Sequence, residues 1–268
     1  MKLQKFLLAV LFSVGFLSCE DVVDVELKES APRLVVEASL LWDVDKEENT
    51  QFIRLTTTAP FFEENIPPAI DATVSVMDDN GREYVFEEMA DGIFRNDEID
   101  PSLELEYTLI IEYEGETYSA TEPLVPTPQL DFVTQDRGGF SGDDYEFKVY
   151  YTDPAEMQNY YLFRYVNDDV SLQIYDDEFT NGNRTFAFFN DEDASTGDIV
   201  AFEIQGISRG FYEYMFILRS QSGSSNGGPF QTQPGIVRGN IVNITNPDNF
   251  AFGYFRLSGT NMLPYVVQ

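Results

Sequence analysis

Carboxylates stand at alternate positions in the segment DVDKE, residues 43–47. Asp43, Asp45 and Glu47 could supply the oxygen ligands that Ca²⁺ prefers. A helix–loop–helix calcium loop, however, needs a glycine at its turn, and residue 48 is glutamate. The pattern therefore favours a solvated tip between two strands. Beyond this weak calcium candidate, the sequence predicts no metal site and no cofactor.

Two residue types that carry much of enzyme chemistry are scarce. The chain has no histidine and a single cysteine, Cys19, in 268 residues. Ser-His-Asp and Cys-His catalysis, histidine-ligated zinc and an internal disulfide are thereby excluded. A carboxylate pair, a lysine or tyrosine base, or an oxygen-ligated cation remain as routes to catalysis.

Acidic residues are abundant, with 47 Asp and Glu, and they cluster at 96–100, 176–178 and 190–193. A glycoside hydrolase needs two carboxylates at a fixed separation, one with a raised pKa. With so many acids some pair meets that distance by chance, and no local motif marks one. We therefore interpret the clusters as solvated loops, predict a protein that is not an enzyme, and keep a carboxylate-based glycan hydrolase as a disfavoured alternative.

The N-terminus reads as a secretory signal. Lys2 and Lys5 precede an apolar run over 6–17, which is too short to span a bilayer comfortably. The tetrapeptide at 16–19, FLSC, resembles a bacterial lipobox, in which the cysteine is acylated, with palmitate among the chains, and becomes the new N-terminus. The resemblance implies that Cys19 is a lipid anchor, since several acyl chains give stable attachment.

The residues after the anchor are acidic. Glu20 and Asp21 follow Cys19 directly, and this patch resembles the export signal of Bacteroidota lipoproteins that are moved to the cell surface. A flexible acidic tether is the alternative interpretation. Cleavage before Cys19 would remove Lys2 and Lys5 and no acid, so the net charge would change from −31 to −33. A surface of that sign repels phosphate backbones, which argues against nucleic acid as a partner.

The first half of the mature chain has the period-two alternation of half-buried strands, for example over 72–77. Asn80-Gly81 is a strong hairpin signal. About seven short strands without a helical stretch predict an immunoglobulin-like β-sandwich over 31–122. Its expected core residues are Leu34, Val36, Ile53, Leu55, Val74, Val76, Leu109 and Ile111. Trp42, the only tryptophan, follows a strand end and fits either the core or a rim contact.

The second half predicts a second β-rich domain over 129–268, after a stiff proline-rich linker at 123–128. Strand patterns cover 145–151, 159–166, 170–175, 185–189, 199–204 and 252–257. Ser208 is the predicted N-cap of one helix over 208–221. The expected order is therefore a signal peptide (1–18), an acidic tether (19–30), the sandwich, the linker and the second domain, in a mostly β fold with about one helix.

Several short motifs recur in an order that resembles a known family. They are CED at 19–21, RLVVE at 33–37, GETYSAT at 115–121, NYY at 159–161, GD at 197–198, IS at 207–208, YEY at 212–214, Pro234, VRGNI at 237–241 and GYF at 253–255. Together they are similar to a Bacteroidota surface lipoprotein family known as domain of unknown function 4249. Its members are often encoded beside TonB-dependent transporters.

That resemblance implies an accessory lipoprotein of the outer membrane that faces the cell exterior. We expect it to capture a substrate or to bind a partner, with a TonB-dependent transporter or another outer-membrane protein as that partner. A structural subunit of an outer-membrane assembly complex is the alternative from a different class. The resemblance supplies no ligand and no catalytic residue.

Overall fold

Alternating apolar residues form the strands of the first half, and the computed structural model places them as predicted. The structure describes residues 31–43, 46, 50–60, 63, 65–138, 144–155, 157–222 and 235–268. Of these, Pro32–Gln268 form one compact unit. The predicted signal peptide and tether, with Cys19, Glu20 and Asp21, lie outside the described residues, as do Asp45 and Glu47.

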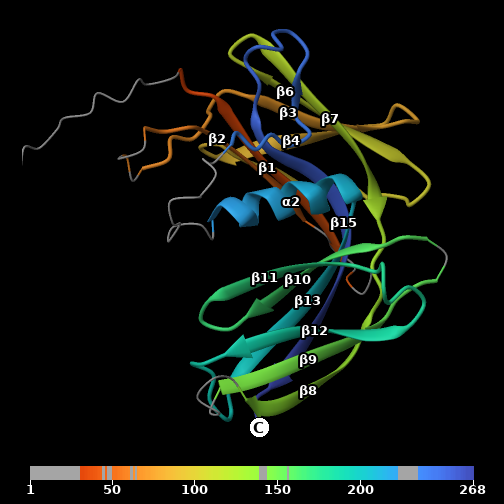
Figure 1. Cartoon of the computed structure of the whole chain (residues 1–268). Helices are drawn as coiled ribbons and strands as arrows, with labels where there is room; N and C mark the ends of the chain where they lie inside the picture. Colours follow the sequence, from red (N-terminus) through yellow and green to blue (C-terminus); the bar gives the residue numbers. More distant parts are fainter. Residues whose placement is uncertain are drawn as a thin grey trace, which may run out of the picture. The chain divides into compact units, whose positions relative to one another are not determined.

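The described chain is mostly β with one helix, which confirms the predicted fold class at that level (Figure 1). Its first strands are β1 (Leu34–Asp43), β2 (Gln51–Thr57), β3 (Thr73–Asp78), β4 (Glu83–Ala90), β5 (Ile93–Asn96), β6 (Glu106–Tyr113) and β7 (Glu116–Val125). The later elements are β8 (Leu130–Gly138), β9 (Asp144–Thr152), β10 (Tyr160–Val166), β11 (Val170–Asp176), β12 (Arg184–Asp191), β13 (Ile199–Ile207), α2 (Arg209–Ser222), β14 (Val242–Asn243) and β15 (Phe252–Val266).

Strands β1–β7 close into a ring with the help of the last strand. The order β15-β1-β2-β5-β4-β3-β6-β7 returns to β15, because Leu124 and Val125 of β7 pair with Leu257 and Ser258. Strand β15 runs parallel to both β1 and β7, so the ring is mixed. The closure comes from a strand more than a hundred residues away, which the seven-strand sandwich predicted for 31–122 did not include.

Two layers are still recognisable within the ring. Strand β4 pairs with β3 through its first half and with β5 through its second, and its register shifts between Glu88 and Ala90. Strands that change sheets in this way make the corners of two-layer β structures. The hairpin predicted at Asn80-Gly81 is confirmed, with a positive φ at Gly81, and Glu114 and Gly115 both have positive φ in the two-residue turn between β6 and β7.

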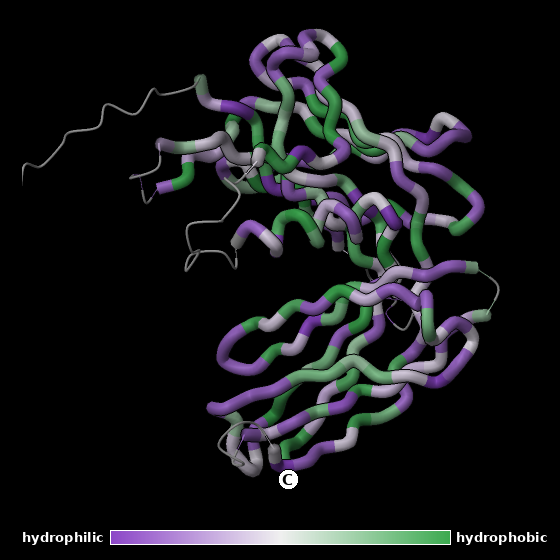
Figure 2. The backbone as a smooth tube through the Cα atoms, in the orientation of Figure 1, coloured by the Kyte–Doolittle hydropathy of each residue, from purple (hydrophilic) through white to green (hydrophobic). Residues whose placement is uncertain are grey.

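The ring encloses the first hydrophobic core. All eight core residues predicted from the sequence are buried there. Trp42 is partly buried and packs against the same core, which answers the question that the sequence left open. Figure 2 shows hydrophilic and hydrophobic residues alternating along many of the strands.

The sheet continues beyond β15 with β13, β10 and β11, while β8, β9 and β12 form a separate three-stranded sheet. A second, aromatic core lies among these strands. It contains Leu130, Tyr145, Phe147, Val149, Tyr151, Tyr161, Phe163, Tyr165, Ala187, Phe189, Ala194, Val200, Phe202, Ile204 and Val267. The six strands predicted for this half are present, and β8 and the two-residue β14 are additions that the sequence analysis missed.

The helix predicted over 208–221 is α2, Arg209–Ser222. The Oγ of Ser208 accepts a hydrogen bond from the backbone N–H of Phe211 at 3.2 Å, as an N-cap should. Phe211 is buried with Leu162, Ile207 and Tyr254, which fixes the first turn of the helix to the sheet.

The segment predicted as a linker is largely part of the fold. Pro123–Val125 end strand β7, and the backbone carbonyl of Pro126 lies against Gly206 of β13. A Cβ added at Gly206 would lie 1.9 Å from that oxygen, so only glycine allows the approach. The two halves thus have separate cores, but they share strand β15 and are joined where residues 124–127 cross β13 and β15.

Candidate functional site

Four neighbouring strands, β10, β13, β15 and β1, present a row of polar side chains on one face. Arg164 of β10 lies directly opposite Glu203 of β13, and Glu203 lies opposite Met262 of β15. Thr260 lies opposite both Gln205 of β13 and Asp43 of β1. Because partners directly opposite in register point to the same side of a sheet, these side chains share one face.

The inner part of the row is a buried hydrogen-bond network around Arg256, which is 5% exposed. Its guanidinium donates to Ser39 Oγ (3.0 Å), Ser258 Oγ (2.6 Å) and Gln205 Oε1 (2.7 Å). It also lies 4.5 Å from the centre of the Phe211 ring. Desolvation lowers the pKa of Arg256 to about 10, so the group stays cationic at neutral pH.

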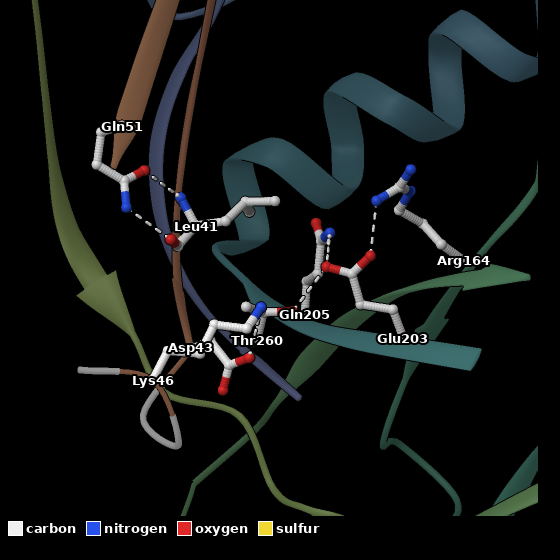
Figure 3. A network of polar contacts seen from close by, with 8 residues as sticks. All are labelled: Leu41, Asp43, Lys46, Gln51, Arg164, Glu203, Gln205 and Thr260. Carbon is white, nitrogen blue, oxygen red and sulfur yellow. Dashed lines mark hydrogen bonds and ion pairs between the residues drawn. The ribbon is translucent and has the colours of Figure 1, made fainter. Parts of the chain in front are cut away.

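Glu203 connects this network to the outer part of the row (Figure 3). Its Oε1 accepts hydrogen bonds from Gln205 Nε2 (2.8 Å) and Thr260 Oγ1 (2.7 Å). Its Oε2 forms an ion pair with Arg164 Nη1 at 2.6 Å. The Glu203 side chain is 4% exposed and that of Arg164 is 33% exposed, so the pair joins the protein interior to the surface.

The outer part of the row borders a cavity of about 290 Å³. It is lined by Leu41, Asp43, Lys46, Thr50, Arg164, Glu203, Thr260 and Met262, which we call the junction pocket. A second ion pair, between Lys46 Nζ and Asp43 Oδ2 at 3.0 Å, lies in the same lining. The junction pocket therefore carries two cations, two carboxylates, two hydroxyls and two apolar side chains.

Gln51 holds one wall of the junction pocket in place. Pairing between β1 and β2 extends only from Leu34 to Glu37 on the β1 side. Further along, the buried Gln51 amide accepts from Leu41 N–H (2.9 Å) and donates to Leu41 C=O (2.7 Å), as Figure 3 shows. The side chain thus replaces a strand partner and fixes the backbone beside Asp43.

The calcium candidate is represented by Asp43 alone, because Asp45 and Glu47 lie outside the described residues. The ammonium of Lys46 lies 3.0 Å from the Asp43 carboxylate. Across the part of the chain that the structure describes, no group of three or more acidic residues could hold a metal ion.

A larger cavity of about 550 Å³ lies beside the acidic cluster at 190–193. Its lining includes Asp168, Asp169 and Asp191. Burial alone would raise the pKa of Asp191, but hydrogen bonds from Tyr165 Oη, Asn167 and two backbone N–H groups lower it below its usual range. Asp191 is thus a fully hydrogen-bonded anion that holds a turn.

A carboxyl group with a raised pKa, as a glycosidase acid requires, occurs at Glu122. Burial raises the pKa of this carboxyl, against the hydrogen bonds that it accepts from Tyr254 Oη (2.9 Å) and Asn240 Nδ2 (3.1 Å). Glu122 lies on β7 and lines neither of the two cavities described above. It therefore contributes no acid to either cavity.

The sequence analysis missed the polar row. One signal in the sequence could have revealed the row. Strands β13 and the first part of β15 are buried on both faces, and such strands are normally apolar throughout. Glu203, Gln205 and Arg256 interrupt those runs, and a buried charged or amide side chain needs partners. Their partners come from four strands far apart in the chain, which no local pattern shows.

The described residues include no helix long and apolar enough to cross a membrane. The family model described as Domain of unknown function (DUF4249) matches residues 20–262, so the chain belongs to that family. The comparison with curated proteins found no match.

Two solved structures show a distant likeness to this chain. A DUF4785 family protein from Legionella pneumophila is 12% identical with a TM-score of 0.24, over 67% of this chain and 54% of that one, so this chain spans about half of its length. The chicken interferon gamma receptor alpha chain is 12% identical with a TM-score of 0.18, over 66% of this chain and 88% of that one.

Proposed function

We propose that this member of the DUF4249 family is a non-enzymatic lipoprotein that captures a small polar solute in the junction pocket. In this proposal Cys19 anchors the chain in the outer membrane of a Bacteroidota cell, and Glu20 and Asp21 direct it to the outer surface. The partner is a TonB-dependent transporter, to which the captured solute passes. The ring of β1–β7 and β15 acts as the immunoglobulin-like module nearest the anchor.

The observation that carries the proposal is the construction of the junction pocket. Its polar groups lie on paired strands, and the buried network of Arg256, Gln205 and Thr260 fixes the Glu203 carboxylate. Ligand sites in proteins combine concavity, an apolar wall and a few fixed polar groups, and the pocket has all three. Groups that are already oriented lose little entropy when a ligand binds.

Co-purification from native membranes tests the proposed place in the cell. The lipidated chain would be extracted in several mild detergents, and its bound proteins identified by mass spectrometry. We expect incorporation of labelled palmitate that Cys19→Ser abolishes, and recovery of an outer-membrane transporter with the wild-type chain. Recovery as a free lipoprotein in every detergent would count against the transporter partnership, and palmitate labelling of Cys19→Ser would count against the anchor.

One observation favours a second function, a structural subunit of an outer-membrane assembly complex. The C-terminal half of α2 exposes Phe216 (61%), Ile217 (47%) and Leu218 (40%) in succession. Their side chains point to different sides of the helix, and such exposed large apolar groups are common where a helix contacts a protein partner. Ligand screening separates the two functions, because a scaffold should show no thermal shift with amino acids, peptides, glycans or metal chelates.

A further inference from the structure

We infer that the junction pocket takes a small zwitterion, a molecule of amino-acid size with one carboxylate and one ammonium group. The inference rests on the proposed capture function and adds the chemical class of the solute. Three features of the pocket point to this class: the placement of its cationic and carboxylate groups, the balance of its charges, and its volume.

Arg164 is suited to hold the carboxylate of the ligand. Glu203 engages one guanidinium nitrogen and so fixes the orientation of the group at the pocket wall. The other guanidinium N–H groups have no hydrogen-bond partner among the described residues, and the side chain is a third exposed. A guanidinium fork matches a carboxylate in two parallel hydrogen bonds. The ammonium of Lys46, in the same lining, adds a second positive charge.

Asp43 is suited to hold the ammonium of the ligand. Its side chain is 12% exposed at the pocket, and Gln51 fixes the backbone two residues before it. The hydroxyls of Thr50 and Thr260 offer further polar contacts, while Leu41 and Met262 supply an apolar wall for the rest of the ligand. A ligand with charges of both signs is the one that uses the whole lining.

The charge of the protein argues for a ligand without net charge. The four charged residues of the lining sum to zero in a chain whose net charge is −31. A free anion is repelled by the field of such a surface, and a free cation is attracted everywhere on it without selection. A neutral sugar would leave two ion pairs to be desolvated without a charged replacement. A zwitterion is neither repelled nor attracted without selection by this surface, and its two charges compensate the desolvation of the two ion pairs.

The volume of about 290 Å³ sets the size of the ligand. Pockets for drug-sized ligands occupy roughly 300–1,000 Å³. The junction pocket is slightly smaller than the lower limit of that range, which favours a single amino acid or a molecule of that size over an oligomer.

Calorimetric titration of the full lipidated chain in detergent tests the class with four probes. L-leucine carries both charges, N-acetyl-L-leucine only the negative one, L-leucinamide only the positive one, and glucose neither. We expect L-leucine to bind, and each of the other three to bind at least about tenfold more weakly, since loss of one charge-assisted hydrogen-bond set costs about 1.4 kcal/mol or more.

Variants locate the binding. Arg164→Gln should weaken L-leucine binding by about tenfold or more. Arg164→Lys keeps a positive charge beside Glu203, so the fold should be retained. The variant loses the guanidinium fork, so L-leucine binding should fall to a value between those of the wild type and Arg164→Gln. Arg184→Gln and Arg184→Lys are the matched controls, because Arg184 pairs with Asp131 on other strands and lies outside the pocket. Both controls should bind L-leucine like the wild type.

The outcomes separate this inference from the capture function. Binding of glucose or of one blocked leucine in preference to L-leucine, with the same dependence on Arg164, overturns the zwitterion class and leaves capture at the pocket standing. If none of the four probes binds, the zwitterion class is also overturned. The capture function is tested separately, by identifying the small molecules that co-purify with the native chain. L-leucine binding that is equal in Arg164→Gln and Arg184→Gln overturns the assignment to the pocket.

Discussion

Glu116 shows how one carboxylate can tie together distant parts of this chain. It accepts hydrogen bonds from the side chains of Asn246 (2.9 Å), Asn249 (2.6 Å), Tyr118 (2.9 Å) and Asn243 (2.8 Å). Four donors favour the ionised form, and these bonds, that from Asn246 foremost, lower the pKa of Glu116 from 4.5 to about 2. The carboxylate therefore fastens the loop at 243–249 to the start of β7.

Replacing Glu116 should remove, already at neutral pH, the stabilising contribution of its carboxylate that the wild type loses only in acid. A carboxyl group whose folded pKa is depressed stabilises the fold above its unfolded pKa of 4.5, and this contribution is lost as the pH falls towards 2. We expect Glu116→Gln to lower the Tm at pH 7, and the difference from the wild type to shrink between pH 4.5 and pH 2. Thermal melts followed by circular dichroism over that range measure it.

The matched control is Glu83→Gln at the exposed start of β4, which removes the same charge. Its Tm should follow that of the wild type at every pH. A Glu116→Gln difference that is constant from pH 7 to pH 2, or equal to that of Glu83→Gln, would contradict the role assigned to the carboxylate.

At the scale of single elements, the first turn of α2 depends on Ser208. Its hydroxyl accepts from Phe211 N–H and also meets Glu122 and Tyr254, so it joins the helix start to β7 and β15. Ser208→Ala should lower the free energy of unfolding by about 1 kcal/mol or more, as loss of an N-cap does. Urea unfolding measures the change. Ser220→Ala, at the exposed end of the same helix, should stay within about 0.5 kcal/mol of the wild type.

The crossing of residues 124–127 over β13 depends on Gly206. A methyl group at this position would lie 1.9 Å from the Pro126 carbonyl oxygen, which is backbone and cannot rotate away. We expect Gly206→Ala to destabilise the protein by roughly 1–3 kcal/mol, the usual cost of overpacking. The control is Gly235→Ala, where a Cβ meets no atom within 4 Å. Equal unfolding midpoints for the two variants would refute this account of the crossing.

The elements differ in how far the sequence alone can predict them. The strands that were predicted, the Asn80-Gly81 hairpin and the capped helix follow from local rules of periodicity and turn chemistry, and they are confirmed, whereas β8 and β14 were missed. The ring closure by β15 does not, because its pairing with β1 joins residues 35 and 252 and leaves no local pattern. The junction pocket escaped prediction for the same reason, since Asp43, Arg164, Glu203 and Thr260 meet only through the long-range pairings β10–β13, β13–β15 and β15–β1.

At the scale of the whole molecule, the shared strand β15 couples the two cores. Phe255 and Leu257 belong to the first core, and Leu263 and Tyr265 of the same strand pack against the second. Two independent domains on a flexible linker would unfold in two steps. One strand that serves both cores predicts a single cooperative transition.

This coupling can be measured with the residues at hand. Trp42, the sole tryptophan, packs on the first core, whereas buried tyrosines lie in both cores, so the tyrosine signal also reports the second. We expect tryptophan fluorescence and near-ultraviolet circular dichroism of the tyrosines to report the same urea midpoint. Midpoints that differ beyond experimental error would show that the cores unfold separately and that β15 does not couple them.

The central claim, capture of a small solute at the junction pocket, can be tested without choosing a ligand. The full lipidated chain would be extracted from its own membranes as wild type, Arg164→Gln and Arg184→Gln, and the small molecules that stay bound identified by mass spectrometry. The account predicts a zwitterion of amino-acid size that is enriched on the wild type and on Arg184→Gln and lost from Arg164→Gln. Identical small-molecule profiles for all three proteins would contradict it.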